Sequence, residues 1–227
     1  MPATNKNAPQ KIMRFLELLF LFVAIPIAIA FLQNRVLMLG ILWATAVIVI
    51  VWLKLSIKRG FWEELNWAGV KSGYKWVLLR FAVIGPALFA FMALVNPEEL
   101  LSFPRERPLI YLYVMIWYPL LSVVPQELLY KTLFFERYKI LFHSPWAMVI
   151  ASALFFGFMH IILVPNIFVL GAWLPVFMTT IAGLLMAHTY FTTRSLALVS
   201  LEHALYGCWA YTIGMGMYLH TGSVWAG

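Results

Sequence analysis

Long apolar stretches, separated by short polar connections, dominate the pattern of the chain. The stretches that reach or approach the length of a membrane span are residues 13–33, 36–56, 76–95, 109–138, 146–163, 173–193 and 195–214. The hydrocarbon core of a bilayer requires about 20 mostly apolar residues in a helix. The pattern therefore predicts an all-α, polytopic transmembrane helical bundle of about seven helices, forming a single integral membrane domain over residues 1–227.

Residues 57–75 differ from the spans because aromatic and charged residues alternate there. Trp62, Trp67 and Tyr74 lie among lysines, an arginine and two glutamates. This mixture is typical of the membrane surface, so we expect an interfacial cytoplasmic segment.

At the N-terminus, the first apolar stretch contains Glu17, and we expect a retained first span, with a cleaved signal peptide as the open alternative.

The composition agrees with a membrane protein. Hydrophobic residues make up 63% of the chain, charged residues make up 11%, and the mean hydropathy is +0.88. The net charge of +7 does not call for a nucleic-acid partner, because lysine and arginine gather on the cytoplasmic side of membranes. Eleven basic residues lie in the connections on one side and three on the other, which predicts a cytoplasmic N-terminus and contact with membrane lipids.

Ionisable side chains inside spans are costly and usually face the bundle interior. They are Glu127 and Lys131 on the fourth span, His160 on the fifth, His188 on the sixth, and Glu202 and His203 on the seventh. Glu17 and Arg80 lie near helix ends, where a long side chain can extend to the membrane surface. At about 1.5 Å per residue, Glu127, His160 and His203 lie roughly 16, 22 and 12 Å from the same boundary of the membrane. Helix tilt can bring them into one layer, so we expect a carboxylate and two imidazoles to meet inside the bundle.

A proline stands beside the acid on the fourth span. Pro125 has no N–H to donate to the Leu121 carbonyl, so it is expected to kink the helix and free that carbonyl. Glu127 and Lys131 share one helix face at i,i+4 spacing. A structural interpretation stays open, in which the two charges only neutralise each other and the histidines are hydrogen-bonded core residues.

Three short motifs follow one another on separate spans. They are Gln126–Lys131, Phe156–His160 and His203–Gly207. Their order and spacing resemble Glu-Glu-x-x-x-Arg, Phe-x-x-x-His and His-x-x-x-Asn of the CPBP (CAAX-processing and bacteriocin-processing, or Abi) family of intramembrane proteases. The resemblance covers about residues 109–215, which we take as the motif-bearing core.

The resemblance implies a site that hydrolyses a peptide bond. Glu127 and His160 would activate a water molecule, His203 would stabilise the oxyanion, and Lys131 would position the acid, while the spacing of Phe156 and His160 lets the ring pack against the imidazole. The implied partner is a peptide or protein substrate, either prenylated or a leader peptide, at a bacterial inner membrane. The cofactor is unknown, since participation of a divalent metal such as zinc is disputed in this family.

The chain also departs from the family pattern. The departures are Gln126 for the first Glu, Lys131 for the Arg and Gly207 for the Asn. An amide cannot act as a general base. Either Glu127 takes over, or Glu202 supplies a carboxylate beside His203, or the protein is not a protease. Glu127, Glu202 and the two histidines also offer a zinc-hydrolase type of ligand set, although no HExxH motif is present.

Three functions are consistent with these residues. The leading interpretation is an intramembrane endopeptidase of the CPBP type that activates water with a glutamate and a histidine. The alternative is a catalytically inactive relative that serves as a membrane scaffold, an immunity factor or a partner-binding protein. A small transporter or proton relay is less favoured, although intramembrane Glu and His also serve that role.

Overall fold

The computed structural model describes residues 8–32, 34–164, 168 and 173–216, and every regular element in them is a helix. Lys6, which contributed to the predicted orientation, and residue 33, which ends the first expected span, lie outside these ranges. Within them, six helical rods are long and apolar enough to cross a membrane, as predicted for a polytopic bundle. The seventh expected span is α12 (Leu196–Thr212), which is 17 residues long.

The rods correspond to the expected spans, except that the third begins at Phe61 instead of residue 76. They run over Ala8–Leu32 (α1, Ala8–Leu19, and α2, Ile25–Leu32), Val36–Ile57 (mainly α3, Arg35–Trp52), Phe61–Val95 (α4, Phe61–Leu65, and α5, Trp67–Val95), Pro108–Arg137 (α7, Pro108–Tyr118, α8, Val124–Glu127, and α9, Phe134–Arg137), Pro145–Leu163 (mainly α10, Pro145–Met159) and Leu174–Thr193 (α11). Short α6 (Ser102–Glu106) precedes α7. Residues 67–75, expected in an interfacial segment, form the first turns of α5.

Polar caps mark where several helices begin. The side chains of Asn34, Asn66, Ser144 and Ser195 each accept a hydrogen bond from a backbone N–H in the first turn of α3, α5, α10 and α12. Such caps satisfy donors that have no partner inside the helix. Ser195 also donates to the Leu65 carbonyl at 2.8 Å, so the start of α12 is attached to the end of α4.

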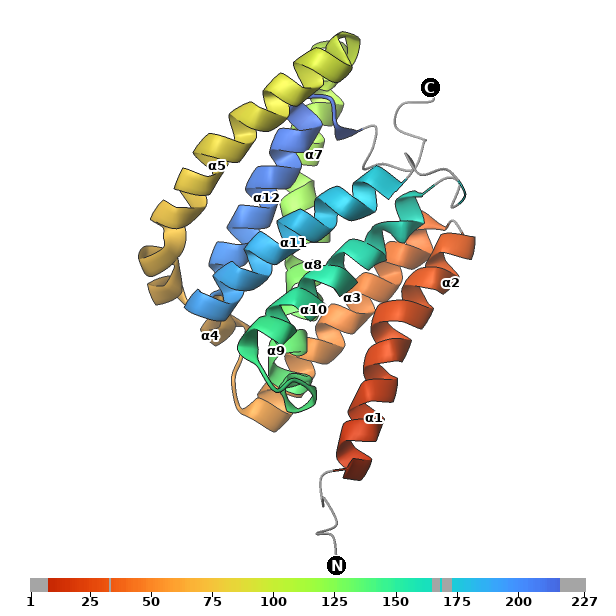
Figure 1. Cartoon of the computed structure of the whole chain (residues 1–227), viewed down its shortest axis with the longest axis vertical. Helices are drawn as coiled ribbons and strands as arrows, with labels where there is room; N and C mark the ends of the chain where they lie inside the picture. The colour runs from red at the N-terminus through yellow and green to blue at the C-terminus, as the bar shows by residue number, and fades with distance from the viewer. Residues whose placement is uncertain (1–7, 33, 165–167, 169–172, 217–227) are drawn as a thin grey trace, which may run out of the picture.

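In Figure 1, α5, α12, α11 and α10 lie side by side, with α7 and α8 behind them and α3, α2 and α1 beyond α10. The main core lies around the lower part of the Pro108–Arg137 rod and combines aliphatic side chains with large aromatic ones. Its largest members include Phe22, Tyr130, Phe134, Phe135, Tyr138, Phe156 and Tyr190. The rings of Phe22 and Tyr130 make an edge contact with centroids 5.1 Å apart, which joins the first rod to the fourth.

Glycines allow α10 and α11 to approach closely. A Cβ added at Gly157 would lie 1.8 Å from Thr180 Oγ1, and one added at Gly183 would lie 3.0 Å from the Phe156 ring. Helices in membranes gain stability from this kind of close packing between small residues. The contact fixes the part of α10 that carries Phe156.

Charged side chains gather at the end of the bundle where the cytoplasmic boundary is expected. Arg59 lies 2.8 Å from Glu136 and 3.1 Å from Glu64, and Arg194 lies 3.5 Å from Glu136. These contacts join the connection after the second rod to the fourth rod and to the start of α12. They hold the lower ends of several helices in register.

A second ionic cluster joins the first rod to the fourth. Arg137 binds Glu17 through two nitrogens, and the Tyr138 hydroxyl donates to Glu17 Oε1 at 3.0 Å. Burial, together with the neighbouring Glu17 carboxylate, raises the pKa of Tyr138 above its ordinary value. The phenol therefore stays protonated and remains a donor.

Substitution of Gly157 by Ala tests the close approach of α10 and α11. The added methyl group meets Thr180, so we expect the free energy of unfolding to fall by about 1–3 kcal/mol. Thermal unfolding in detergent measures the change. Gly40→Ala on α3 is the matched control, because a Cβ there meets nothing within 4 Å and stability should not fall. Equal melting temperatures for Gly157→Ala and the wild type would contradict the packing argument.

Candidate active site

The rod that carries Glu127 is not a regular α-helix. Two π-helical segments, Pro119–Val123 and Leu128–Leu133, lie on either side of α8. Single π-helical turns are often found at functional sites, because they change the direction of side chains within a helix. The distortion surrounds the polar residues Gln126 and Glu127.

Neighbouring helices satisfy the carbonyls that this distortion exposes. Trp43 Nε1 on α3 donates to the Leu121 carbonyl at 3.0 Å, the group that Pro125 was expected to leave free. Ser152 Oγ on α10 donates to the Tyr130 carbonyl at 2.7 Å. Unsatisfied carbonyls cost several kcal/mol in a membrane, so these bonds stabilise the irregular segment.

Glu127 lies at the centre of the site and is completely buried. Its Oε1 is 2.7 Å from His203 Nδ1, and its Oε2 is 3.6 Å from Lys131 Nζ. A carboxylate only accepts hydrogen bonds, so His203 Nδ1 carries a proton and donates it. The structure therefore brings the acid of the fourth rod and the imidazole of α12 into direct contact.

The chain of hydrogen bonds continues beyond His203. His203 Nε2 lies 3.1 Å from the hydroxyl of Tyr118, the last residue of α7. When the imidazole is neutral and protonated at Nδ1, its Nε2 accepts and the phenol donates. Glu127, His203 and Tyr118 thus form one carboxylate–imidazole–phenol series. Sequence reasoning missed Tyr118, because this tyrosine lies outside all three motifs.

Phe156 packs between the other polar residues. Its ring makes an edge contact with His203, with centroids 5.3 Å apart, and its centroid lies 5.1 Å from that of His160. Lys131 Nζ lies 4.6 Å from the centre of the same ring. A cation over an aromatic face gains about 2 kcal/mol or more when it is desolvated. Phe156 therefore helps hold the buried ammonium while it separates the two imidazoles.

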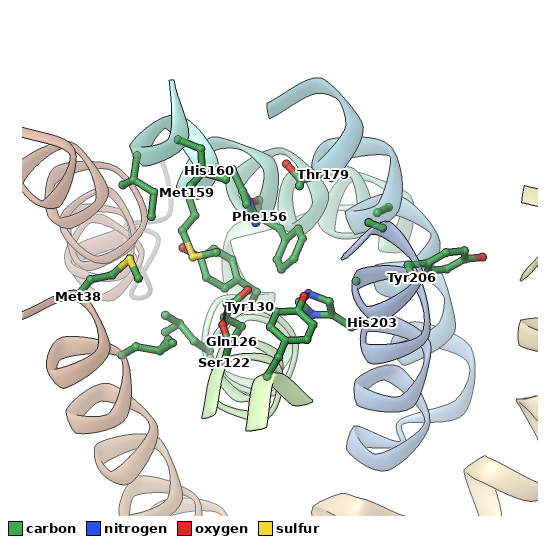
Figure 2. Close-up of a pocket in the computed structure, with 18 of the residues that line it drawn as sticks. Met38, Ser122, Gln126, Tyr130, Phe156, Met159, His160, Thr179, His203 and Tyr206 are labelled. Atoms are coloured by element: carbon green, nitrogen blue, oxygen red, sulfur yellow. Dashed lines mark hydrogen bonds between the residues drawn. The ribbon is translucent and has the colours of Figure 1, made fainter. Parts of the chain in front are cut away.

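His160 stands on the other side of Phe156. Its Nδ1 is 2.8 Å from the Phe156 carbonyl oxygen, which can only accept, so Nδ1 is the protonated nitrogen. A neutral ring then has its lone pair at Nε2. Figure 2 shows His160, Phe156 and His203 directed toward the same space.

That space is a cavity of about 650 Å³. His160, His203, Tyr118, Gln126 and Gly207 contribute to its wall, together with apolar side chains from the first three rods and from α10, α11 and α12. Glu127 and Lys131 do not line it, because they lie behind His203 and Phe156. The acid can act on a molecule in the cavity only through His203.

Gln126 presents an amide to the cavity. Its Nε2 donates to Ser122 Oγ at 2.7 Å, and its buried Oε1 has no hydrogen-bond partner among the described residues. A buried acceptor without a partner is unfavourable. An N–H group of a molecule bound in the cavity would satisfy it.

Glu202 lies outside the cavity wall, and its carboxylate turns away from His203 toward α5. Its Oε1 lies 3.1 Å from Arg80 Nη1 on α5, and the side chain is fully buried. Adjacent residues of a helix point about 100° apart, which explains why Glu202 and His203 face different neighbours. The interpretation that Arg80 extends to the membrane surface was wrong, because its guanidinium turns inward to Glu202 and to the Leu185 carbonyl.

The side chains do not fit a metal site. Among the described residues, no group of three or more His, Cys, Asp or Glu side chains is placed to hold a metal ion. The two nitrogens of His203 face Glu127 and Tyr118, and His160 Nδ1 faces a carbonyl. We therefore assign no step of the chemistry to a metal.

A helical bundle with a buried carboxylate–imidazole pair beside an intramembrane cavity defines a polytopic membrane protein with an internal polar site. Residues 108–209 match the model of the Rce1-like family, described as type II CAAX prenyl endopeptidase Rce1-like. This match confirms the resemblance to CAAX-type intramembrane proteases and includes all three motifs. Searches of curated proteins and of solved structures each gave no match.

Removal of the Lys131 ammonium tests how the buried acid is tolerated. Lys131→Met leaves Glu127 without its lysine partner, and we expect the free energy of unfolding to fall by about 3–5 kcal/mol. The double variant Lys131→Met, Glu127→Gln should recover part of this loss, because the neutral amide oxygen can still accept from His203. Unfolding in detergent measures both. A single variant as stable as the wild type would show that Lys131 does not compensate the acid.

Proposed function

We propose that the protein is an intramembrane endopeptidase of the CPBP type. The observation that carries this proposal is the placement of His160 and His203 around one cavity, with Glu127 bonded directly behind His203. The family match over residues 108–209 supports the same class of activity. The cavity wall is mostly apolar, which suits a peptide segment or an attached lipid chain that enters from the membrane.

In this proposal His160 is the general base. Its Nδ1 proton is held by the Phe156 carbonyl, so its Nε2 can take a proton from a water molecule in the cavity. The water oxygen attacks the carbonyl carbon of the substrate, and a tetrahedral oxyanion forms. When the C–N bond breaks, the proton on His160 passes to the leaving nitrogen. Water and peptide thus become a carboxylic acid and an amine.

Glu127 and His203 would stabilise the negative charge of this intermediate. Glu127 does not line the cavity, but its contact with His203 favours a proton on that imidazole. Positive charge on His203 stabilises an oxyanion nearby, most strongly in a site from which bulk water is excluded. Lys131 balances the charge of Glu127.

We also infer that the N-terminus lies in the cytoplasm. The clusters around Glu136 and Glu17 lie at one end of the bundle and contain Arg59, Arg137 and Arg194. This basic end is expected to face the cytoplasm.

A cleavage assay tests the role of His160. The protein is reconstituted in liposomes with two internally quenched probes, a peptide ending in a farnesylated CAAX sequence and an unprenylated leader-type peptide. We expect wild-type cleavage of at least one probe, and a loss of about 10²–10⁴-fold for His160→Ala. His188→Ala is the matched control, because His188 stacks on Trp146 outside the cavity. Equal losses in both variants would contradict the assignment, and no wild-type cleavage would contradict the proposed function.

A catalytically inactive relative that binds a partner is the second candidate. It is favoured by Gln126, which places an amide in the cavity wall, and by the position of Glu127 behind His203. In that case the cavity would bind a segment of a partner without cleaving it.

Gln126→Glu distinguishes the two candidates. If the site lacks only an acid in the cavity wall, the variant should gain cleavage that the wild type does not show. If His160 and His203 already suffice, we expect cleavage to change by less than about tenfold or to decrease. A carboxylate at position 126 cannot donate the hydrogen bond that the amide gives to Ser122 Oγ, and its charge would lie in an apolar wall. The same liposome assay measures both variants, with Gln126→Asn as an uncharged control.

A further inference from the structure

The Tyr118 hydroxyl belongs to the cavity wall and contacts His203, and the mechanism above does not use it. Tyr118 ends α7, and the π-helical segment Pro119–Val123 follows it directly. Its ring makes edge contacts with Tyr211 at 5.3 Å and with His203 at 6.1 Å between centroids. These contacts fix the ring, so the hydroxyl has a defined position against His203 Nε2.

Gly207 makes this position available. A Cβ at Gly207 would lie 2.3 Å from the Tyr118 oxygen and 2.6 Å from its Cε1. Real Cβ atoms do not come this close to another heavy atom, so any larger residue at 207 would displace the phenol. Gly207 lies one turn after His203 on α12 and has no side chain. The Tyr118 hydroxyl from α7 occupies the space that a side chain at position 207 would fill.

The hydrogen-bond series also determines which way the hydroxyl can point. His203 Nδ1 donates to Glu127. When His203 is also protonated at Nε2, that N–H donates to the Tyr118 oxygen, and the phenolic proton is free to point elsewhere. Tyr118 lines the cavity, so its O–H can then donate to an acceptor inside it.

We propose that Tyr118 is a catalytic hydrogen-bond donor to the carbonyl oxygen of the bound substrate, coupled to Glu127 through His203. This inference rests on the proposed peptidase function. The phenol keeps its O–H bond throughout: it donates a hydrogen bond to the oxyanion while water gives its proton to His160. His203 keeps both of its protons, and its positive charge strengthens the phenol as a donor.

Tyr118→Phe removes only the hydroxyl and retains the ring contacts. With the farnesylated or leader-type probe that the wild type cleaves, we expect kcat to fall by about 10²–10³-fold while KM changes by less than about threefold. Tyr111→Phe is the matched control. Tyr111 also lies on α7 and bonds to α12, through Thr212 Oγ1 at 3.0 Å, but it does not line the cavity. Removal of the Tyr111 hydroxyl should leave kcat within about threefold of the wild type.

A second pair of variants tests whether the space beside Gly207 is the place where the donor is needed. Tyr118→Ala should lower kcat at least as much as Tyr118→Phe. Adding Gly207→Asn supplies an amide N–H from α12 in the vacated space, and we expect kcat to recover by about tenfold or more. No recovery, together with unchanged kcat in Tyr118→Phe, would overturn the proposal.

Folding is checked by thermal unfolding of each variant in detergent. If Tyr118→Phe does not yield folded protein, replacement of Tyr118 by 3,5-difluorotyrosine retains the side-chain shape and makes the donor more acidic. We expect kcat to change by at least about twofold in that protein, and an unchanged kcat would overturn the proposal. Wild-type cleavage that is insensitive to Tyr118 would refute only this role, whereas wild-type protein that cleaves neither probe would refute the proposed function as well.

Discussion

The structure depends on the compensation of one carboxylate inside an apolar bundle. A charged group in such surroundings must be paired, neutralised or exposed to water. Glu127 is fully buried, and its two oxygens face His203 and Lys131. Because one partner comes from its own rod and the other from α12, the requirement to pair the charge also fixes the position of α12 against the fourth rod. The arrangement of the candidate site follows from that constraint.

Close helix packing places the remaining groups around this pair. The glycines of α10 and α11 bring Phe156 to the point where its ring contacts both imidazoles and the Lys131 ammonium. At the lower end of the bundle, the Glu136 and Glu17 clusters tie the helices together through side chains that lie near the expected boundary. Close packing in the middle of the bundle and ionic contacts at its lower end thus hold the same helices together. Both limit how far the two histidines can move apart.

Much of this arrangement could be predicted from the sequence, because its signals are local. The bounds of most rods follow from apolar length, although the third rod begins within the charged and aromatic residues 57–75. Polar residues inside apolar runs pointed to Glu127, His160 and His203. Tyr118 gave no such signal, since an aromatic residue near a helix end is ordinary in a membrane protein. The pair of Arg80 and Glu202 was missed for a related reason: a long side chain can extend to the surface or turn inward, and only tertiary contacts decide between them. The π-helical segments likewise depend on donors from α3 and α10.

The position of Glu127 behind His203 has a consequence for what can enter the protein. Of the described residues that line the cavity, none is Asp, Glu, Lys or Arg. A visiting molecule therefore meets neutral amides, rings and aliphatic groups, while the ionic pair stays insulated behind them. Because no such charged group lines the wall, a lipid-like molecule that enters does not have to displace water bound tightly to a charge. The Glu127–Lys131 pair acts on that molecule only through the His203 imidazole. The cavity can therefore bind lipid-like chains while a buried ionic pair lies next to its wall.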